Sequence, residues 1–197
     1  MEEDFQNIKE QLESKFVNKL LDFVLNGDNN PTFRSDPEPF MFCYNIVTHY
    51  GNKHSVAEKL FNYHNEVIEK GINSAYEKIK DLSGLELADS FVLFTERINY
   101  LILKMFHIFS YIEFYYMKSV GKKYDKLVKF SLEIYKKCFY DKLKEKINEI
   151  LNGNVVDETK KEKIKASIKH LEFAEPIIQI KKEDKTVFWL EKENEKK

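Results

Sequence analysis

The sequence predicts an all-α protein built as a helical bundle. Glycine and proline, the residues that most often interrupt helices, number only six and four among 197 residues, and charged residues make up 33%. Apolar residues recur every three or four positions through most of the chain, which is the spacing of an amphipathic helix. We therefore expect five to six long helices joined by short breaks.

The first half of the chain divides into three helices. Apolar residues at helical spacing predict a helix over residues 4–26, stopped by Gly27 and the sequence "DNNP": Phe5, Ile8, Leu12, Phe16, Leu20 and Phe23. The next segment, "GDNNPTFRSDPEP", holds three of the four prolines and predicts a loop. A second helix is expected over 38–50, and "GNKHS" separates it from a third over 54–81.

The second half continues the same pattern. A fourth helix is expected over residues 86–119, after the break "DLSGLELADS", and a fifth over 122–151, before "NGN". A sixth, short and basic, is expected over 157–173 with Asp157 as its N-cap. We assign residues 1–175 to one helical domain.

Residues 176–197 differ from the helices and form a charged tail with an apolar anchor. Two short β-prone runs, "IIQI" and "TVFWL", flank a polar stretch and precede a Lys- and Glu-rich end. A hairpin, a helix that pairs elsewhere and an irregular extension anchored at Trp189 all remain open. We expect a short irregular or hairpin-like tail.

Composition excludes several classes of function. The chain carries 32 Lys and Arg against 33 Asp and Glu, so its net charge of −1 gives no general attraction to nucleic acid or to anionic lipid. The beginning of the chain is charged and lacks the apolar stretch of a secretory signal, and Arg97 and Lys104 interrupt the most apolar helix. We expect no membrane span, a cytoplasmic or nuclear location, and buried free thiols at Cys43 and Cys138.

Catalytic motifs are scarce. The five histidines include no pair at the i, i+4 spacing of a helical zinc site, and the sequence has no P-loop, no GxGxxG and no GxSxG. We expect a non-catalytic protein with no metal, no cofactor and no small-molecule substrate. The alternative is an all-α enzyme that uses Glu96 or Glu113 with His107, and a closed pocket joining these side chains would favour it.

The stretch "MFHIFSYIEFYYM", residues 105–117, has more apolar residues than one helix face needs. At about 100° per residue, one stripe forms the expected core face: Phe91, Phe94, Ile98, Leu101, Met105, Phe109, Ile112 and Tyr116. The opposite side carries Leu103, His107, Ser110, Tyr111 and Phe114, where an exposed helix would show Lys and Glu. The helix is either central and packed all round, or it holds a second face for a partner.

The predicted second helix shows the same excess. In "PFMFCYNIVTHY", one side carries Phe40, Tyr44, Val47 and Thr48, and the other carries Phe42, Ile46 and His49. Both sides are therefore rich in apolar residues. Two helices with two apolar faces each predict one shared docking site.

Three segments, in order, resemble the first N-terminal repeat of the cullins. "PFMFCYNIVTHYGNKHSVAEKLFNYHNEVI" resembles the family's second helix and the turn into its third. "ERINYLILKMFHIFSYIEFYYMKSV" resembles the fifth, and "KLVKFSLEIYKKCFYDKLKEKINEILNGNVVD" follows the pattern that comes after it. The resemblance covers about residues 5–173. Thr48, Phe114 and Tyr116 depart from the residues usual in the family.

The resemblance implies a five-helix repeat that binds a partner protein. In cullins the second and fifth helices of this repeat bind a Skp1-like or BTB-domain adaptor within a ubiquitin ligase. Carried over, the partner-binding residues are Phe40, Met41, Tyr44, Val47, Thr48, His107, Tyr111 and Phe114. Nothing in residues 174–197 resembles the cullin region that holds the RING protein, so the chain is expected to be a non-catalytic scaffold module. The alternative is a helical tethering or coat subunit unrelated to ubiquitin.

Overall fold

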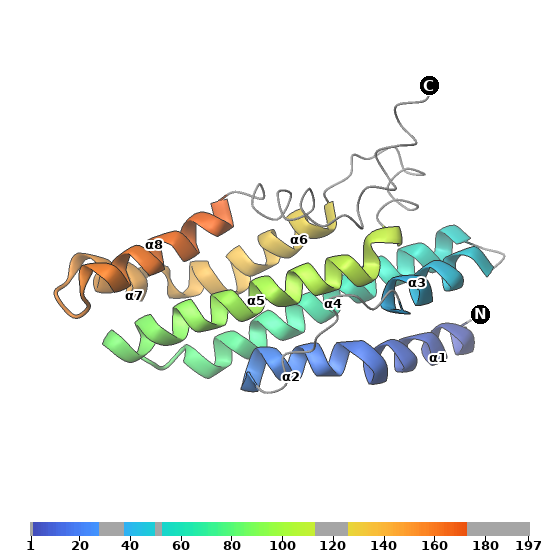
Figure 1. Cartoon of the computed structure of the whole chain (residues 1–197), viewed down its shortest axis with the longest axis horizontal. Coiled ribbons are helices and arrows are strands. Elements are labelled where there is room, and N and C mark those ends of the chain that lie inside the picture. Colours follow the sequence, from blue (N-terminus) through green and yellow to red (C-terminus); the bar gives the residue numbers. More distant parts are fainter. Residues whose placement is uncertain (1, 28–37, 50–52, 113–125, 173–197) are drawn as a thin grey trace, which may run out of the picture.

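The computed structural model describes residues 2–27, 38–49, 53–112 and 126–172. These ranges are helical apart from short turns, and they contain no strand. The helices lie side by side along one direction and form an elongated bundle (Figure 1). The predicted all-α bundle is thereby confirmed, while the predicted tail lies outside the described ranges.

The helices match the predicted ones closely. The first predicted helix is α1, a π-helical turn and α2, and the fifth is α6, a second π-helical turn and α7. The described elements are α1 (Glu2–Leu12), the first π segment (Glu13–Val17), α2 (Asn18–Asn26), α3 (Glu38–His49), α4 (Lys53–Ile79), α5 (Gly84–Ile112), α6 (Lys126–Tyr135), the second π segment (Lys136–Tyr140), α7 (Asp141–Asn152) and α8 (Glu158–Glu172).

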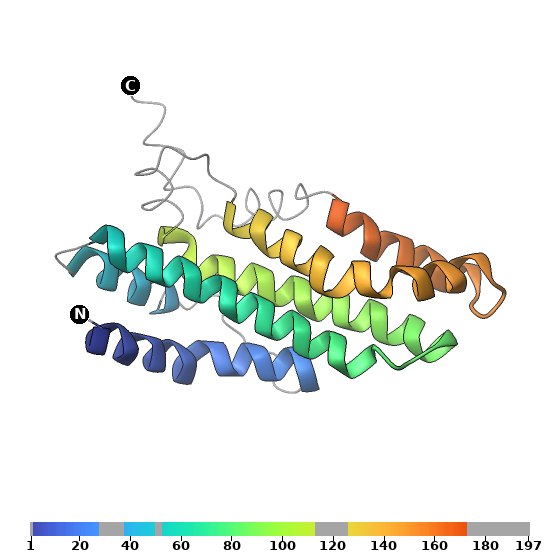
Figure 2. The same ribbon diagram turned by 180° about the vertical axis from the view of Figure 1, so that it is seen from behind.

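Helix α5 is the centre of the bundle. It packs against α2, α3, α4, α6, α7 and α8, and both ribbon views show it between the other helices (Figures 1 and 2). The predicted core face is buried along the whole described helix: Phe91, Phe94, Ile98, Leu101, Met105, Phe109 and Ile112. Thr95, Ile102 and Ile108 are buried as well, so the buried stripe is wider than predicted. The last predicted member, Tyr116, lies outside the described residues.

The first π segment keeps the apolar residues of the first helix facing the core. Five of its buried residues follow one another at intervals of four: Ile8, Leu12, Phe16, Leu20 and Val24. In an ideal α-helix that interval drifts by about 40° at each step, because one turn takes 3.6 residues. A π-helical turn takes up an additional residue and sets the stripe back. The segment Glu13–Val17 therefore returns the second half of this helix to the same core.

The second π segment does the same for the fifth predicted helix. Counted at about 100° per residue from Leu127, Leu143 would fall on nearly the opposite side of a regular α-helix, yet both are buried. The intervening π segment accounts for this change of phase. Phe130 on α6 is 38% exposed, and its ring lies 5.7 Å from that of Phe61.

Two helix ends are fixed by contacts from other helices. Gly27 ends α2 in the left-handed region, with φ of 74°, and its N–H donates to the Phe23 carbonyl at 2.9 Å. A Cβ at this position would overlap the guanidinium of Arg97, which donates to the Val24 carbonyl at 3.3 Å. Beyond the end of α4, the Lys146 ammonium donates to the Lys80 carbonyl at 2.6 Å. These bonds tie α2 to α5 and α4 to α7.

Asp157 is the N-cap of α8, as the sequence predicts. Its Oδ1 accepts a hydrogen bond from the backbone N–H of Lys160 at 2.8 Å, and its carbonyl accepts the first helical bond from Lys161 at 3.0 Å. This carboxylate therefore satisfies a donor that the first turn of α8 would otherwise leave unpaired.

Replacing this cap is expected to destabilise the protein modestly. Asp157→Ala should lower the free energy of unfolding by about 1 kcal/mol, the usual value of an N-cap bond. Urea denaturation followed by circular dichroism measures the change. Asp157→Asn, which keeps a capping oxygen, is the matched control and should stay within a few tenths of a kcal/mol of the parent protein. An equal loss in both variants would contradict the assignment.

Both cysteines are free and buried, which confirms the prediction for Cys43 and Cys138. Burial raises the pKa of the Cys43 thiol far above its ordinary value, so this thiol stays protonated. Within the ranges that the structure describes, none of the helices combines the length and the apolar composition that a membrane crossing requires.

His64 is a titratable side chain enclosed by the core. It is fully buried, and its ring lies 5.5 Å from that of Phe109 on α5. Nδ1 lies 3.1 Å from Oδ1 of Asn65, whereas Nε2 is buried without a hydrogen-bond partner. Burial lowers the pKa of His64 to about 4 from its ordinary value of 6.5, so the folded protein holds a neutral imidazole at pH 7.

This lowered pKa makes the fold sensitive to acid. The unfolded chain takes up a proton on His64 near pH 6.5, and the folded chain does so only near pH 4. The contribution of neutral His64 to stability is therefore fully present above pH 6.5 and is lost as the pH falls toward 4. Between pH 7 and 4.5 this side chain should account for about 2.5 kcal/mol of the fall in unfolding free energy. Urea denaturation at both pH values measures it.

Two variants separate His64 from other groups that titrate over this range. His64→Gln removes the titration and should reduce the fall between pH 7 and 4.5 by about 2.5 kcal/mol. Leu85→Ala changes an exposed side chain of α5 that does not titrate and should leave the fall unchanged. An identical fall in the parent protein and in His64→Gln would show that protonation of His64 does not cause the loss of stability in acid.

Candidate partner-binding surface

Helix α3 has an inner and an outer side. Cys43, Ile46 and Val47 are buried where the helix packs on α4 and α5. Met41 and Tyr44, on the outer side, are 41% and 36% exposed. The 12 residues of Glu38–His49 thus attach one side of α3 to the core and leave large side chains on the other.

Near the end of α5, Tyr111 lies beside two aromatic rings of α3. The Tyr111 ring lies 4.7 Å from that of Tyr44, at an interplanar angle of 70°, and 6.1 Å from that of Phe40, at 89°. Edge-to-face arrangements of this kind are the favourable geometry for aromatic pairs. The structure therefore brings together three of the predicted partner-binding residues, contributed by two helices that are far apart in the sequence.

The hydroxyl groups beside these rings bond to their own helices. Thr48 Oγ1 donates to the carbonyl of Tyr44 at 2.9 Å and approaches that of Asn45 at 3.2 Å. Ser110 Oγ donates to the His107 carbonyl at 3.1 Å. Because both hydroxyls are satisfied within the helix, a partner can cover them without leaving a buried donor unpaired.

The partner-binding surface is defined here as Phe40, Met41, Tyr44, Thr48, His107 and Tyr111. All six are at least partly exposed. Aromatic residues and methionine are enriched in protein interfaces, where a tyrosine combines a large apolar ring with a polar end. Such a surface can hold an apolar side chain of a partner against the rings and offer the tyrosine hydroxyls at its edge.

Two predicted residues are not included in this definition. Val47 has no exposed area, because it lies on the side of α3 that packs against α4 and α5. Val47 is therefore not part of the exposed surface in this structure. Phe114 lies outside the described residues, as does Glu113. Of the eight predicted partner-binding residues, one is thus buried and another lies outside the described residues.

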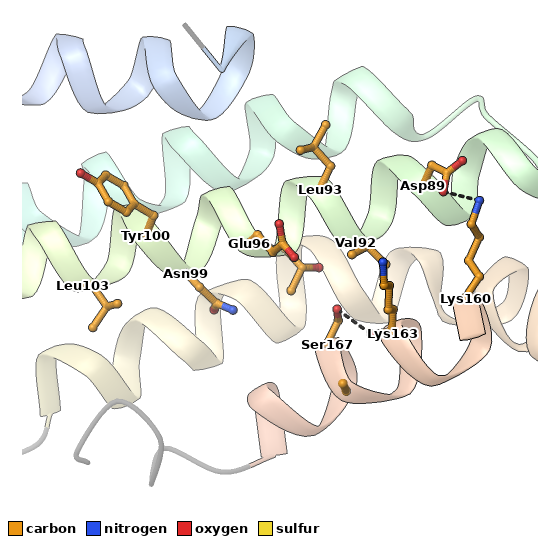
Figure 3. Close-up of a pocket in the computed structure, with 12 residues that line it drawn as sticks. Asp89, Val92, Leu93, Glu96, Asn99, Tyr100, Leu103, Lys160, Lys163 and Ser167 are labelled. Atoms are coloured by element: carbon orange, nitrogen blue, oxygen red, sulfur yellow. Dashed lines mark hydrogen bonds and ion pairs between the residues drawn. The ribbon is translucent and has the colours of Figure 1, made fainter. Parts of the chain in front are cut away.

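A groove of about 660 Å³ lies between α5 and α8, apart from the partner-binding surface (Figure 3). An ion pair between Lys160 Nζ and Asp89 Oδ1, 2.6 Å long, closes one end. Glu96 lines the groove, but His107 is not among its lining residues, and about 16 Å of helix separates the two. The structure does not bring Glu96 and His107 into one closed pocket, so the predicted enzymatic pair gains no support.

Sequence reasoning did not find this groove. Its wall on α8 consists of Lys160, Lys163, Ala166 and Ser167, which look in sequence like the polar side of a surface helix. The residue that indicates the groove is Leu93, an apolar residue that is 43% exposed on the most buried helix of the bundle. In the described part of the chain, no group of three or more His, Cys, Asp or Glu side chains is placed to hold a metal ion.

In comparisons with known proteins, no family model, no curated protein and no solved structure matches the chain. The fold and the two surfaces described above are therefore the basis for assigning a function.

Proposed function

We propose that this chain is a non-catalytic, cullin-like helical module that binds an adaptor of the Skp1-like or BTB fold in a ubiquitin ligase complex. The observation that supports the proposal best is the meeting of Phe40, Tyr44 and Tyr111 between α3 and α5. These helices correspond to the segments that resemble the adaptor-binding helices of cullins. A scaffold of this kind would work in the cytoplasm or the nucleus.

The mechanism we propose is apolar docking onto a surface that is already ordered. Packing on two neighbouring rings restricts the Tyr111 side chain before any partner arrives. Binding then costs less conformational entropy than it would with free aromatic side chains. The exposed Met41 is flexible and can adjust to the shape of the partner. The tyrosine rings supply the anchors, and the tyrosine hydroxyls at the edge of the surface set the orientation.

A binding panel tests the proposal against its alternative. The full chain is titrated, by isothermal calorimetry, with a purified Skp1-like protein, with several BTB-domain proteins and with subunits of vesicle tethers. We expect saturable 1:1 binding to a protein of the first two kinds. Binding confined to tether subunits would favour the tethering class instead, and an absence of binding to every Skp1-like and BTB protein would contradict the proposal.

A further inference from the structure

The groove between α5 and α8 has an apolar floor and charged rims. Val92, Leu93, Leu103 and Ala166 supply apolar surface, while Glu96 and Lys163 bring one charge of each sign (Figure 3). Leu93 is 43% exposed although its helix is the centre of the core. A groove with this lining suits a short apolar segment that is flanked by charges of both signs.

Helix α8 carries the chain along this groove. It runs parallel to α5, since Lys160 pairs with Asp89 at the start of both lining segments and Ser167 lies farther along in the same direction (Figure 3). At equal rise per residue, Glu172 lies about level with Leu101. Helix α8 therefore ends beside the far end of the groove.

We propose that residues 186–190 of this chain, "TVFWL", occupy the groove. Thirteen residues separate Glu172 from Thr186, and such a tether extends over about 20 Å on average and about 43 Å at most. The farthest lining residue, Asp89, is only about 18 Å back along α5 from the level of Glu172. Four consecutive apolar residues, Val187 to Leu190, would cover the floor.

Charge and tethering both favour this occupant. Lys185 precedes the apolar run and Glu191 follows it, so the segment carries both signs of charge, as the rims of the groove do. A short tether gives an effective concentration on the order of millimolar. Even an intrinsic affinity of about 1 mM would therefore keep the groove occupied for much of the time.

Docking of this segment has a consequence for partner binding, and this consequence rests on the proposed function. Leu93, Tyr100, His107 and Tyr111 lie within about 40° of one line along α5, at intervals of seven, seven and four residues. The groove and the partner-binding surface are thus two parts of one strip. A segment docked in the groove would compete with an adaptor that extends along α5.

Trp189 is the one tryptophan of the chain, so its fluorescence reports the docking directly. The emission maximum of the full chain should lie at shorter wavelength than that of a synthetic peptide of residues 173–197. Leu93→Glu places a charge in the groove and should shift the maximum to that of the peptide. Leu85→Glu, at a similarly exposed leucine near the start of the same helix, is the matched control and should leave the maximum unchanged.

Each other result would overturn the proposal. Emission of the parent protein equal to that of the peptide would show that the segment is not docked. An unchanged maximum in Leu93→Glu would place the segment elsewhere, and equal shifts in both variants would show a loss of fold rather than of docking. A maximum that depends on protein concentration would identify the occupant as a second copy of the chain.

The competition is measured separately. If the segment competes with the adaptor, Phe188→Asp plus Trp189→Asp should tighten adaptor binding several-fold. An unchanged affinity with normal docking would remove the competition and leave the docking intact. Absence of adaptor binding in both proteins would instead count against the proposed function, because the fluorescence experiment needs no partner.

Discussion

Replacing Tyr44 and Tyr111 together with alanine is expected to weaken adaptor binding by about 100- to 1,000-fold. Aromatic anchors in interfaces usually contribute about 1–4 kcal/mol each, and 1.4 kcal/mol corresponds to a factor of ten in affinity. The two rings are 4.7 Å apart and support each other. The single variants are therefore expected to be non-additive, with each removing part of the contribution of the other. Calorimetric titration with the adaptor measures all three variants.

Two sets of controls make this result specific. Tyr44→Phe plus Tyr111→Phe keeps both rings and should retain most of the affinity, which separates the rings from their hydroxyls. Phe130→Ala removes a ring of similar exposure on α6, away from the surface, and should bind like the parent protein. Unchanged affinity in a folded Tyr44→Ala, Tyr111→Ala protein would contradict the site assignment.

Replacing Phe109 with alanine is expected to have the largest effect on stability, a loss of about 3–5 kcal/mol in the free energy of unfolding. Phe109 is fully buried on α5, and its ring packs near the rings of Tyr63 at 6.2 Å and His64 at 5.5 Å, both on α4. Truncation would leave a cavity between α4 and α5, the two helices that contribute the most buried apolar residues. Because a typical domain has only about 5–15 kcal/mol in total, the midpoint of urea denaturation should fall sharply.

The size of this effect depends on burial, and two variants show it. Phe109→Leu fills most of the space and should cost clearly less than the alanine variant. Leu85→Ala changes a residue of the same helix that is 50% exposed and should stay within about 0.5 kcal/mol of the parent protein. A loss below about 1 kcal/mol in Phe109→Ala would contradict the central position of this residue in the core.

The helices and their core faces could be predicted because the sequence repeats one physical signal. Glycine, proline and polar residues mark the breaks, and apolar spacing identifies the buried stripe of α5 from Phe91 to Ile112. Asp157 could be predicted as a cap because its position is set by local hydrogen bonding alone. The predictions that depend only on residues close together in the sequence were thus the accurate ones.

The two π segments could not be predicted from spacing. A regular helix allows only one phase, which would place Leu127 and Leu143 on nearly opposite sides of the helix that contains the π segment at Lys136–Tyr140, and both are buried instead. The added residue in each π segment is compensated by packing between helices that are distant in sequence. That packing is a property of the folded bundle rather than of any local stretch.

The candidate site shows the same limit. Spacing identified two apolar sides on α3 and α5, but it could not decide which residues would meet there. Val47 and Tyr44 are three residues apart, yet one is fully buried and the other is 36% exposed. The division depends on the angle at which α3 packs against α4 and α5. The approach of Tyr111 to Phe40 and Tyr44 likewise required the tertiary structure.

Amide hydrogen exchange of the full chain, with and without a saturating Skp1-like or BTB adaptor, tests the central claim most directly. Bound partners slow exchange where they cover a surface or stabilise a helix. We predict slower exchange in α3 and in the last three turns of α5, with α7 unchanged. Exchange that is the same everywhere with every adaptor tested, or protection confined to α7, would contradict the claim that α3 and α5 together form the adaptor-binding surface.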